Sequence, residues 1–297
     1  MSQSRAYRLE EGEPLSKAVG RIARGRIDHA LDELRGKTDS TPEEAVHGAR
    51  KDMKKLRALL RLVRGELGEQ RFARENACFR DSARELAGAR DADVMLGTLD
   101  SLELPGGLGW ELRKVIQADR ERDGAGGDRD EATRDAVSIL KEGRKRVGDW
   151  PLEDDSFDAL AGGLERTYRR GRRDFKAART EPSVEALHEW RKRVKDLWYH
   201  QTLLRPLWPP VMTAVGDDAH ELSDRLGDDH DLAVLGDWFR EHTEPDPDLQ
   251  AAIDRRRAEL QRDAFALGAR LYADKPSAYV RRLERLWDAA QTRVRAP

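Results

Sequence analysis

The stretch Val46-His-Gly-Ala-Arg-Lys-Asp-Met-Lys-Lys-Leu-Arg-Ala-Leu-Leu-Arg-Leu-Val-Arg64 predicts a helix with two contrasting faces. At about 100° per residue, one side is apolar and wide enough to face a protein core. The cations fall on a second stripe, roughly 100° wide, that borders this apolar face. Its members are Arg50, Lys54, Arg57, Arg61 and Arg64. The helix therefore places a row of positive charge beside the core and not around the solvent side.

A second stretch, 141 residues downstream, repeats the pattern. From Leu187 the chain again reads apolar-His, with Arg three residues after the histidine and Lys seven after it. Arg-Gly-Arg-x-Asp occurs at both 24–28 and 170–174, and 86–94 resembles 226–234. Because order and spacing agree across separate motifs, we expect an internal repeat with halves at 15–148 and 152–295.

Charge is abundant and locally segregated. The net charge of the 297 residues is −2, although 38% of them are charged. Residues 164–205 hold 12 Lys or Arg against 6 acidic residues, and 216–248 hold 12 acidic residues against 2 Arg. Such separation allows a chain to hold a polyanion at one site without nonspecific binding over the rest of its surface.

Cysteine content and hydropathy indicate the cellular compartment in which the protein is expected. Cys78 is the only cysteine, which excludes an internal disulfide framework and favours a reducing interior. The first residues lack the apolar core of a signal peptide, and no apolar run approaches the roughly 20 residues of a membrane span. We expect a cytoplasmic protein with no membrane association.

Helical spacing runs through the whole chain, and we find no alternating strand pattern. Thr41-Pro42-Glu43-Glu44 predicts a helix start with a capping box, and Gly68 is placed to end that region. The segments 86–94 and 226–234 each predict a helix end, a glycine turn and a new helix capped by Asp91 or Asp231. The expected helices are 16–34, 41–67, 71–87, a helix from 91, 110–122, a helix ending at 147, 156–179, 183–205, 210–226, 231–242, 248–271 and 276–294. The fold class is therefore all-α.

Two histidine patterns have an alternative, metal-binding interpretation. Glu44 and Glu185 each precede a histidine, His47 or His188, by three residues, as in half of a carboxylate-bridged di-iron site in a helical bundle. Three observations oppose a metal here: Glu44 is explained by the capping box, cations follow each histidine on its own face, and further carboxylate ligands are not evident. We therefore expect no metal, no cofactor and no catalytic residue. The histidines would donate to phosphate, orient a neighbouring carboxylate or serve a structural role.

These motifs together resemble the CHAD family, the conserved histidine α-helical domain, over about residues 15–295. Val46, His47, Arg50 and Lys54 begin the first signature, and Leu187 begins the second. The resemblance implies one domain of two antiparallel four-helix bundles, related by a pseudo-twofold axis, with a basic groove or pore between them. It also implies binding of inorganic polyphosphate without enzyme activity, and association with polyphosphate granules. Asp196 and Trp198 depart from the second signature, where basic residues are usual, and Ala87 replaces a glycine.

The expected polyphosphate contacts come from the two stripes and from the helix that precedes each of them. They are Arg24, Arg26, His47, Arg50, Lys51, Lys54, Lys55, Arg57, Arg61, Arg170, Arg172, Arg173, His188, Arg191, Lys192 and Lys195. Two other functions remain open at this point. One is a metal-dependent phosphatase or polyphosphatase, and the other is a scaffold for an acidic protein segment or RNA, with nucleic acid otherwise only a competing polyanion. The sequence does not indicate an oligomeric state.

Overall fold

The computed structural model describes residues 5–86, 91–123 and 129–295, which form helices and loops and contain no strand. The all-α prediction is confirmed. No helix within these ranges has the length and apolar character needed to cross a membrane. The helices are α1 Leu15–Leu34, α2 Pro42–Leu62, α3 Arg64–Leu67, α4 Glu69–Glu85, α5 Asp91–Asp100, α6 Leu108–Asp123, α7 Arg129–Arg146, α8 Asp158–Thr180, α9 Val184–Leu203, α10 Pro209–His242, α11 Pro247–Leu271 and α12 Pro276–Arg295, with short 3-10 turns η2 Val147–Asp149 and η3 Arg205–Leu207.

Local chemistry sets most helix ends where the sequence predicts them. Thr41 caps α2 by accepting from the backbone N–H of Glu44, and the Glu44 carboxylate accepts from the backbone N–H of Thr41. This reciprocal pair is the predicted capping box. Gly68 has φ of 71° where α3 gives way to α4, a conformation that favours glycine.

One predicted break is wrong, because α10 continues through residues 226–231 as a single helix. Packing on both sides explains the continuity. Leu226 is buried, and the buried Asp229 accepts from Arg257 and Gln261 of α11 at 3.0 and 2.8 Å. Asp231 is thus an interior helix residue and not a cap. The equivalent turn in the first half falls at 87–90, outside the described residues, although α4 ends and α5 begins on either side of it as expected.

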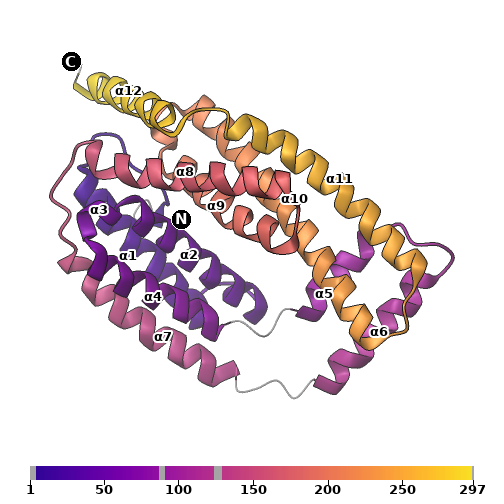
Figure 1. Cartoon of the computed structure of the whole chain (residues 1–297). Coiled ribbons are helices and arrows are strands. Elements are labelled where there is room, and N and C mark those ends of the chain that lie inside the picture. The colour runs from indigo at the N-terminus through magenta and orange to yellow at the C-terminus, as the bar shows by residue number, and fades with distance from the viewer. Residues whose placement is uncertain (1–4, 87–90, 124–128, 296–297) are drawn as a thin grey trace.

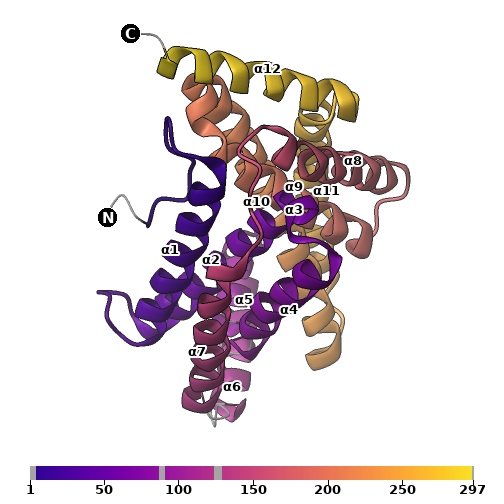
Figure 2. The ribbon, with the colours of Figure 1, turned by 90° about the vertical axis from the view of Figure 1, so that its left-hand side faces the viewer.

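The helices form two neighbouring groups that meet along α2 (Figures 1 and 2). In the first, α1 packs on α2 and α7, and α4 packs on the same two helices. In the second, α9 lies between α8 and α10, α11 packs on α10, and α12 crosses α8. Contacts of α2 with both α8 and α9 join the groups.

The α5–α6 hairpin lies away from the rest of the first group. It packs against the far end of α10, beside α11 (Figure 1). Leu99, Leu112 and Ile116 of the hairpin join Leu235 and Ile253 in a separate small core. Helices from the first half of the chain therefore complete the packing of the second half.

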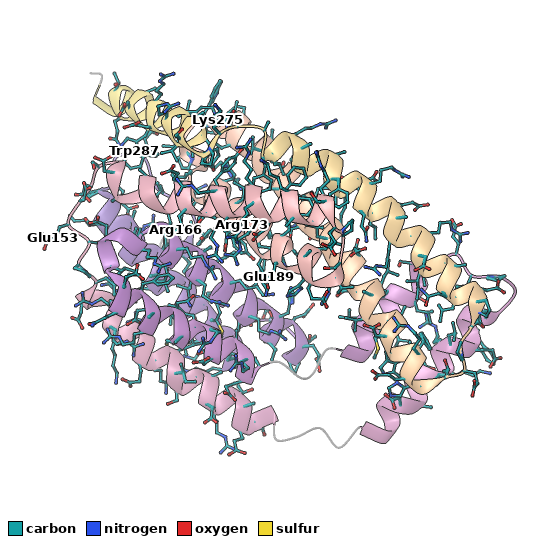
Figure 3. All side chains as sticks on the ribbon, viewed as in Figure 1. Glu153, Arg166, Arg173, Glu189, Lys275 and Trp287 are labelled. Atoms are coloured by element: carbon teal, nitrogen blue, oxygen red, sulfur yellow. The ribbon has the colours of Figure 1, made fainter. Side chains whose placement is uncertain are left out.

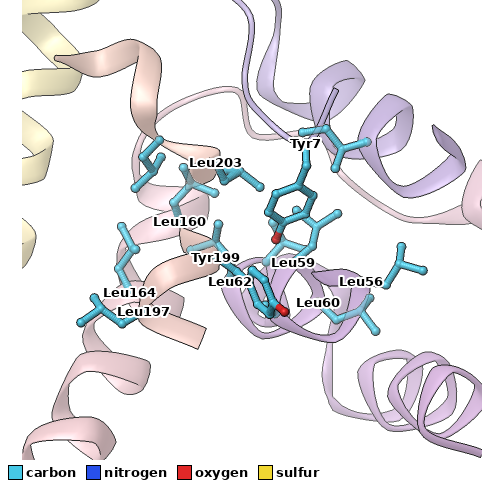
Figure 4. Packing of buried hydrophobic residues seen from close by; sticks show 14 of the residues in the cluster. Tyr7, Leu56, Leu59, Leu60, Leu62, Leu160, Leu164, Leu197, Tyr199 and Leu203 are labelled. Carbon is cyan, nitrogen blue, oxygen red and sulfur yellow. The ribbon is translucent and has the colours of Figure 1, made fainter. Parts of the chain in front are cut away.

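The main core is built around α2. Met53, Leu56, Leu59, Leu60 and Leu62 are each completely inaccessible to solvent. They lie among side chains from both halves, as Figure 4 shows for Leu160, Leu164, Leu197 and Leu203. Full burial of such side chains contributes about 1.5–3 kcal/mol each. The apolar face of α2 is thus the largest single reason for its central position.

A close approach of two backbones fixes α8 against α2. A Cβ atom added to Gly163 would lie 1.9 Å from the carbonyl oxygen of Leu62. A real Cβ cannot occupy that space, so α8 could reach this position only with glycine there. The preceding residue, Gly162, faces open space, with nothing within 4 Å of an added Cβ.

These neighbours provide a matched test of the α2–α8 contact. Gly163→Ala should lower the free energy of unfolding by about 1–3 kcal/mol through overpacking. Gly162→Ala should leave it unchanged or raise it by up to about 1 kcal/mol, because alanine is the better helix former. Urea unfolding followed by circular dichroism would measure both; equal effects of the two changes would contradict the close approach.

Candidate functional site

The basic stripe of α2 meets α9 where the two helices cross. His200 of α9 donates from Nε2 to the Ala58 carbonyl at 3.0 Å, which marks the crossing. Beside it, Arg61 donates to the Asp196 carboxylate at 2.9 Å. Arg57, one turn earlier, donates to the Asn76 side chain of α4 at 3.1 Å. Arg57 and Arg61 therefore reach into the junction of the two helix groups, whereas Lys54 of the same stripe is exposed to solvent.

Eight cations form two sets along α2 and α9, one of Arg57, Arg61, Arg80, Arg170 and Arg193 and one of Lys54, Arg191 and Lys195, and together we call them the cationic cluster. The positive charge of each acts on at least one other member, or is held by the same carboxylate as another member. The members are Lys54, Arg57 and Arg61 of α2, Arg80 of α4, Arg170 of α8, and Arg191, Arg193 and Lys195 of α9. Figure 3 labels Arg166 and Arg173 of α8, and Arg170 lies between these two in the sequence. The cluster thus joins both halves of the chain.

Crowding and burial make the charged state of the cluster costly. Burial, followed by the nearby Arg191 and Lys54, lowers the pKa of Lys195 to about 7, while Asp224 and Asp231 of α10 oppose the shift. Burial, with Arg61, Arg80 and Arg193, likewise lowers the pKa of Arg57 to about 10. The pKa of Arg170 is lowered by burial and then by Arg193. These directions are those expected for cations that are first buried and then held near like charges.

A glycine of α10 makes room for one member. The Arg191 guanidinium packs against Gly227, where an added Cβ would lie 2.4 Å from Nη2. The sequence predicts a turn at this glycine, but its role in the structure is to admit an arginine. Close by, the rings of His188 and His230 lie 4.7 Å apart. Burial lowers the pKa of His188, and His230, Lys192 and Arg191 add to the effect.

Six of the predicted contact residues belong to the cationic cluster, and five others lie at its margins. Lys192 pairs with Glu189 at 2.5 Å, and Arg173 pairs with Asp174 at 2.8 Å. Arg50 donates to the Leu86 carbonyl at the end of α4, at 3.4 Å. His47 is exposed near the start of α2, and His188 lies beside α10. The six members are Lys54, Arg57, Arg61, Arg170, Arg191 and Lys195.

The remaining predicted residues lie elsewhere. Arg26 is buried between α1 and α2, where it donates to Asp52 at 3.1 Å. Lys55 approaches the same carboxylate, at 3.9 Å, and burial lowers its pKa to about 8. Lys51 lies over the Trp198 ring, with Nζ 5.8 Å from the centroid.

Two predicted arginines lie near other partners. The Arg24 guanidinium approaches Gly148 of η2. Burial raises the pKa of the Tyr168 phenol, and Arg172 is close enough to oppose that rise. The second Arg of each Arg-Gly-Arg motif, Arg26 or Arg172, therefore lies away from the junction of α2 and α9.

Sequence reasoning missed Arg80 and Arg193. Arg193 lies on the core-facing side of α9 and is only 7% exposed, so a search for an exposed stripe passes over it. The sequence feature that could have indicated it is Asp196, about one turn later on the same helix. The Asp196 carboxylate lies 3.3 Å from the Arg193 guanidinium. Arg80 belongs to α4, which has no recognised echo in the second half. Only the tertiary fold brings it within range of Arg57.

Among the residues that the structure describes, no three His, Cys, Asp or Glu side chains form a group that could hold a metal ion. Comparison with known families gives one match, the CHAD domain, over residues 21–240. Comparison with curated proteins gives no match. The matched range runs from α1 to near the end of α10, and it includes every member of the cationic cluster.

The lowered pKa of Lys195 predicts a specific pH dependence. Between pH 7 and about 10.5 the unfolded chain binds a proton at Lys195 that the folded protein has mostly released. The free energy of unfolding should therefore rise with pH across this window through this residue, and the penalty should be fully present below pH 7. Lys195→Met should remove this part of the slope and stabilise the protein at pH 6.

Urea unfolding between pH 6 and 10 would measure the slope, and NMR of the lysine side chains would report the pKa directly. Lys176 of α8 is an exposed lysine outside the cluster, so Lys176→Met serves as the control. A Lys195 signal that titrates only near pH 10.5 would contradict the crowded arrangement.

Proposed function

The chain belongs to the CHAD family, and we propose that it binds inorganic polyphosphate through the cationic cluster without catalysing its cleavage. The observation that carries the proposal is the gathering of cations from four helices, of which those on α2 and α9 include the partly or fully buried Arg57, Arg61, Arg191, Arg193 and Lys195. Mutual repulsion there disfavours the protein without a ligand. A bound anion with several charges would relieve that repulsion at many cations together.

Linear polyphosphate matches both the chemistry and the extent of the cluster. Guanidinium groups suit phosphate through paired N–H donors, and ammonium groups suit it as compact charges. Along α2, the span from Lys54 to Arg61 is roughly 10 Å, and the whole stripe extends farther at about 1.5 Å per residue. A chain of phosphates supplies negative charge along that length, whereas a single phosphate reaches only part of it.

The internal repeat gives this site a structural rationale. We propose that the two halves are related by a pseudo-twofold axis, and that α2 and α9 are equivalent helices whose stripes face a shared groove. Their contact at Ala58 and His200, 142 residues apart, supports this arrangement. The same binding chemistry would hold the protein at polyphosphate granules in the cytoplasm.

Loss of two α2 cations should weaken binding strongly. Lys54→Gln combined with Arg57→Gln should lower affinity for long-chain polyphosphate at least about 10-fold, and should reduce the slope of log affinity against log salt by about 2. Fluorescence anisotropy of labelled polyphosphate, measured over a range of salt, would give both quantities. Thermal unfolding should show no loss of stability, because the change relieves repulsion.

The matched control removes two positive charges outside the cluster, through Arg24→Gln with Arg172→Gln. This variant should keep most of the affinity of the wild-type protein. Equal losses in the two double variants would mean that net charge, and not this junction, determines binding.

Competition distinguishes polyphosphate binding from generic polyanion binding. RNA at matched phosphate concentration and near-physiological salt should displace labelled polyphosphate poorly, because bases and ribose separate its phosphates. Equal displacement would favour the scaffold alternative. Stoichiometric metal in the purified protein, with phosphate release in Mg²⁺ or Mn²⁺, would favour the phosphatase alternative.

A further inference from the structure

Asp196 places a negative charge inside the cationic cluster. Its side chain is almost completely buried at the crossing of α2 and α9, with the residue 4% exposed. One carboxylate oxygen accepts from Arg61 of α2 at 2.9 Å, and the other lies 3.3 Å from Arg193 of α9. A single carboxylate therefore binds a guanidinium from each half of the chain.

The charge of Asp196 extends beyond these two partners. Asp196 opposes the lowering of the Arg57 pKa, which Arg61, Arg80 and Arg193 promote. Arg61 and Arg193 also contribute to the lowering of the Arg170 pKa. Asp196 is thus a counter-ion among cations that come from α2, α4, α8 and α9.

One carboxylate does not satisfy two guanidiniums. The Nε atom of Arg193 is buried and has no hydrogen-bond partner among the described residues. The group of two arginines and one carboxylate keeps a net positive charge, and each guanidinium has donors beyond those used by Asp196. The cluster can therefore still attract an anion while its centre is partly neutralised.

We infer that Asp196 is a built-in counter-ion that stabilises the empty cationic cluster and limits how tightly it binds its ligand. This inference rests on the proposed polyphosphate site. The empty protein depends on Asp196 to offset repulsion between α2 and α9, whereas the occupied protein receives negative charge from the ligand as well. Removal of the carboxylate therefore destabilises the empty state more than the occupied state, and affinity rises.

Packing indicates that charge, and not geometry, dominates the effect. The Arg61 and Arg193 side chains are 19% and 8% exposed, so surrounding side chains hold both guanidiniums in place. Asp196→Asn preserves the size of the side chain and removes its charge. The two guanidiniums should then remain at the crossing with more of their charge available to a phosphate chain.

The test compares Asp196→Asn with the wild-type protein and with Asp263→Asn. Asp263 of α11 pairs with Arg225 of α10 at 3.0 Å and takes no part in the cluster. Asp263→Asn removes one negative charge, as Asp196→Asn does, so the two variants have the same net charge. Without ligand, Asp196→Asn should unfold at a lower temperature than wild type. It should bind long-chain polyphosphate about 5-fold more tightly or better, with a larger ligand-induced rise in unfolding temperature than either other protein.

Affinity of Asp196→Asn equal to or below that of wild type would overturn the counter-ion role and leave only a structural one. A wild-type protein that does not bind polyphosphate would instead overturn the proposed function. If Asp196→Asn does not fold alone, it should be refolded from urea with and without polyphosphate. Recovery only with polyphosphate supports the inference; no recovery, while wild type binds, overturns it.

Discussion

The packing of α2 against helices from both halves of the chain is the constraint on which the rest of the structure depends. Five of its apolar side chains, Met53, Leu56, Leu59, Leu60 and Leu62, are completely buried. At about 1.5–3 kcal/mol each, their burial stabilises the fold by an amount of order 10 kcal/mol. The cations that border this face cannot move away without exposing it. Apolar burial thereby holds Lys54, Arg57 and Arg61 against α9 and α4 despite their mutual repulsion.

The sequence predicts the helices well because their signals are local. Caps, helical spacing and glycines give the ends of α1, α8, α9 and α11 to within a few residues, whereas the predicted helix 41–67 is divided at Val63 into α2 and α3. The exception is instructive, because Gly227 reads locally as a turn. Its neighbours Leu226 and Asp229 are buried against other helices, and the space left by the missing Cβ holds Arg191. A single sequence does not distinguish a glycine that bends the backbone from one that admits a side chain.

The residues of the candidate site that lie along one helix could be predicted from the sequence. Those brought together from different helices could not. The α2 stripe could be found from spacing alone, and Lys54, Arg57 and Arg61 all lie at the junction. Arg26 belongs to a basic motif of its own helix and was predicted as a contact on that ground, yet it is buried in an ion pair with Asp52. Arg80 and Arg193 join the cluster only through tertiary packing. The role of Asp196 also depends on the fold, since the sequence shows only an acidic residue among basic ones.

The acidic residues of α10 show where the acidic segment of the sequence lies relative to the cations. Asp224 and Asp231 lie near Lys195 and favour its protonated form, against the burial and the cations that disfavour it. Asp196, the next residue of α9, likewise favours the protonated form of Arg57. The cations are therefore bounded by carboxylates on α10 and divided by one at the α2–α9 crossing. Local separation of cations from carboxylates is how a protein with a net charge of only −2 could hold a polyanion at one site, as we propose.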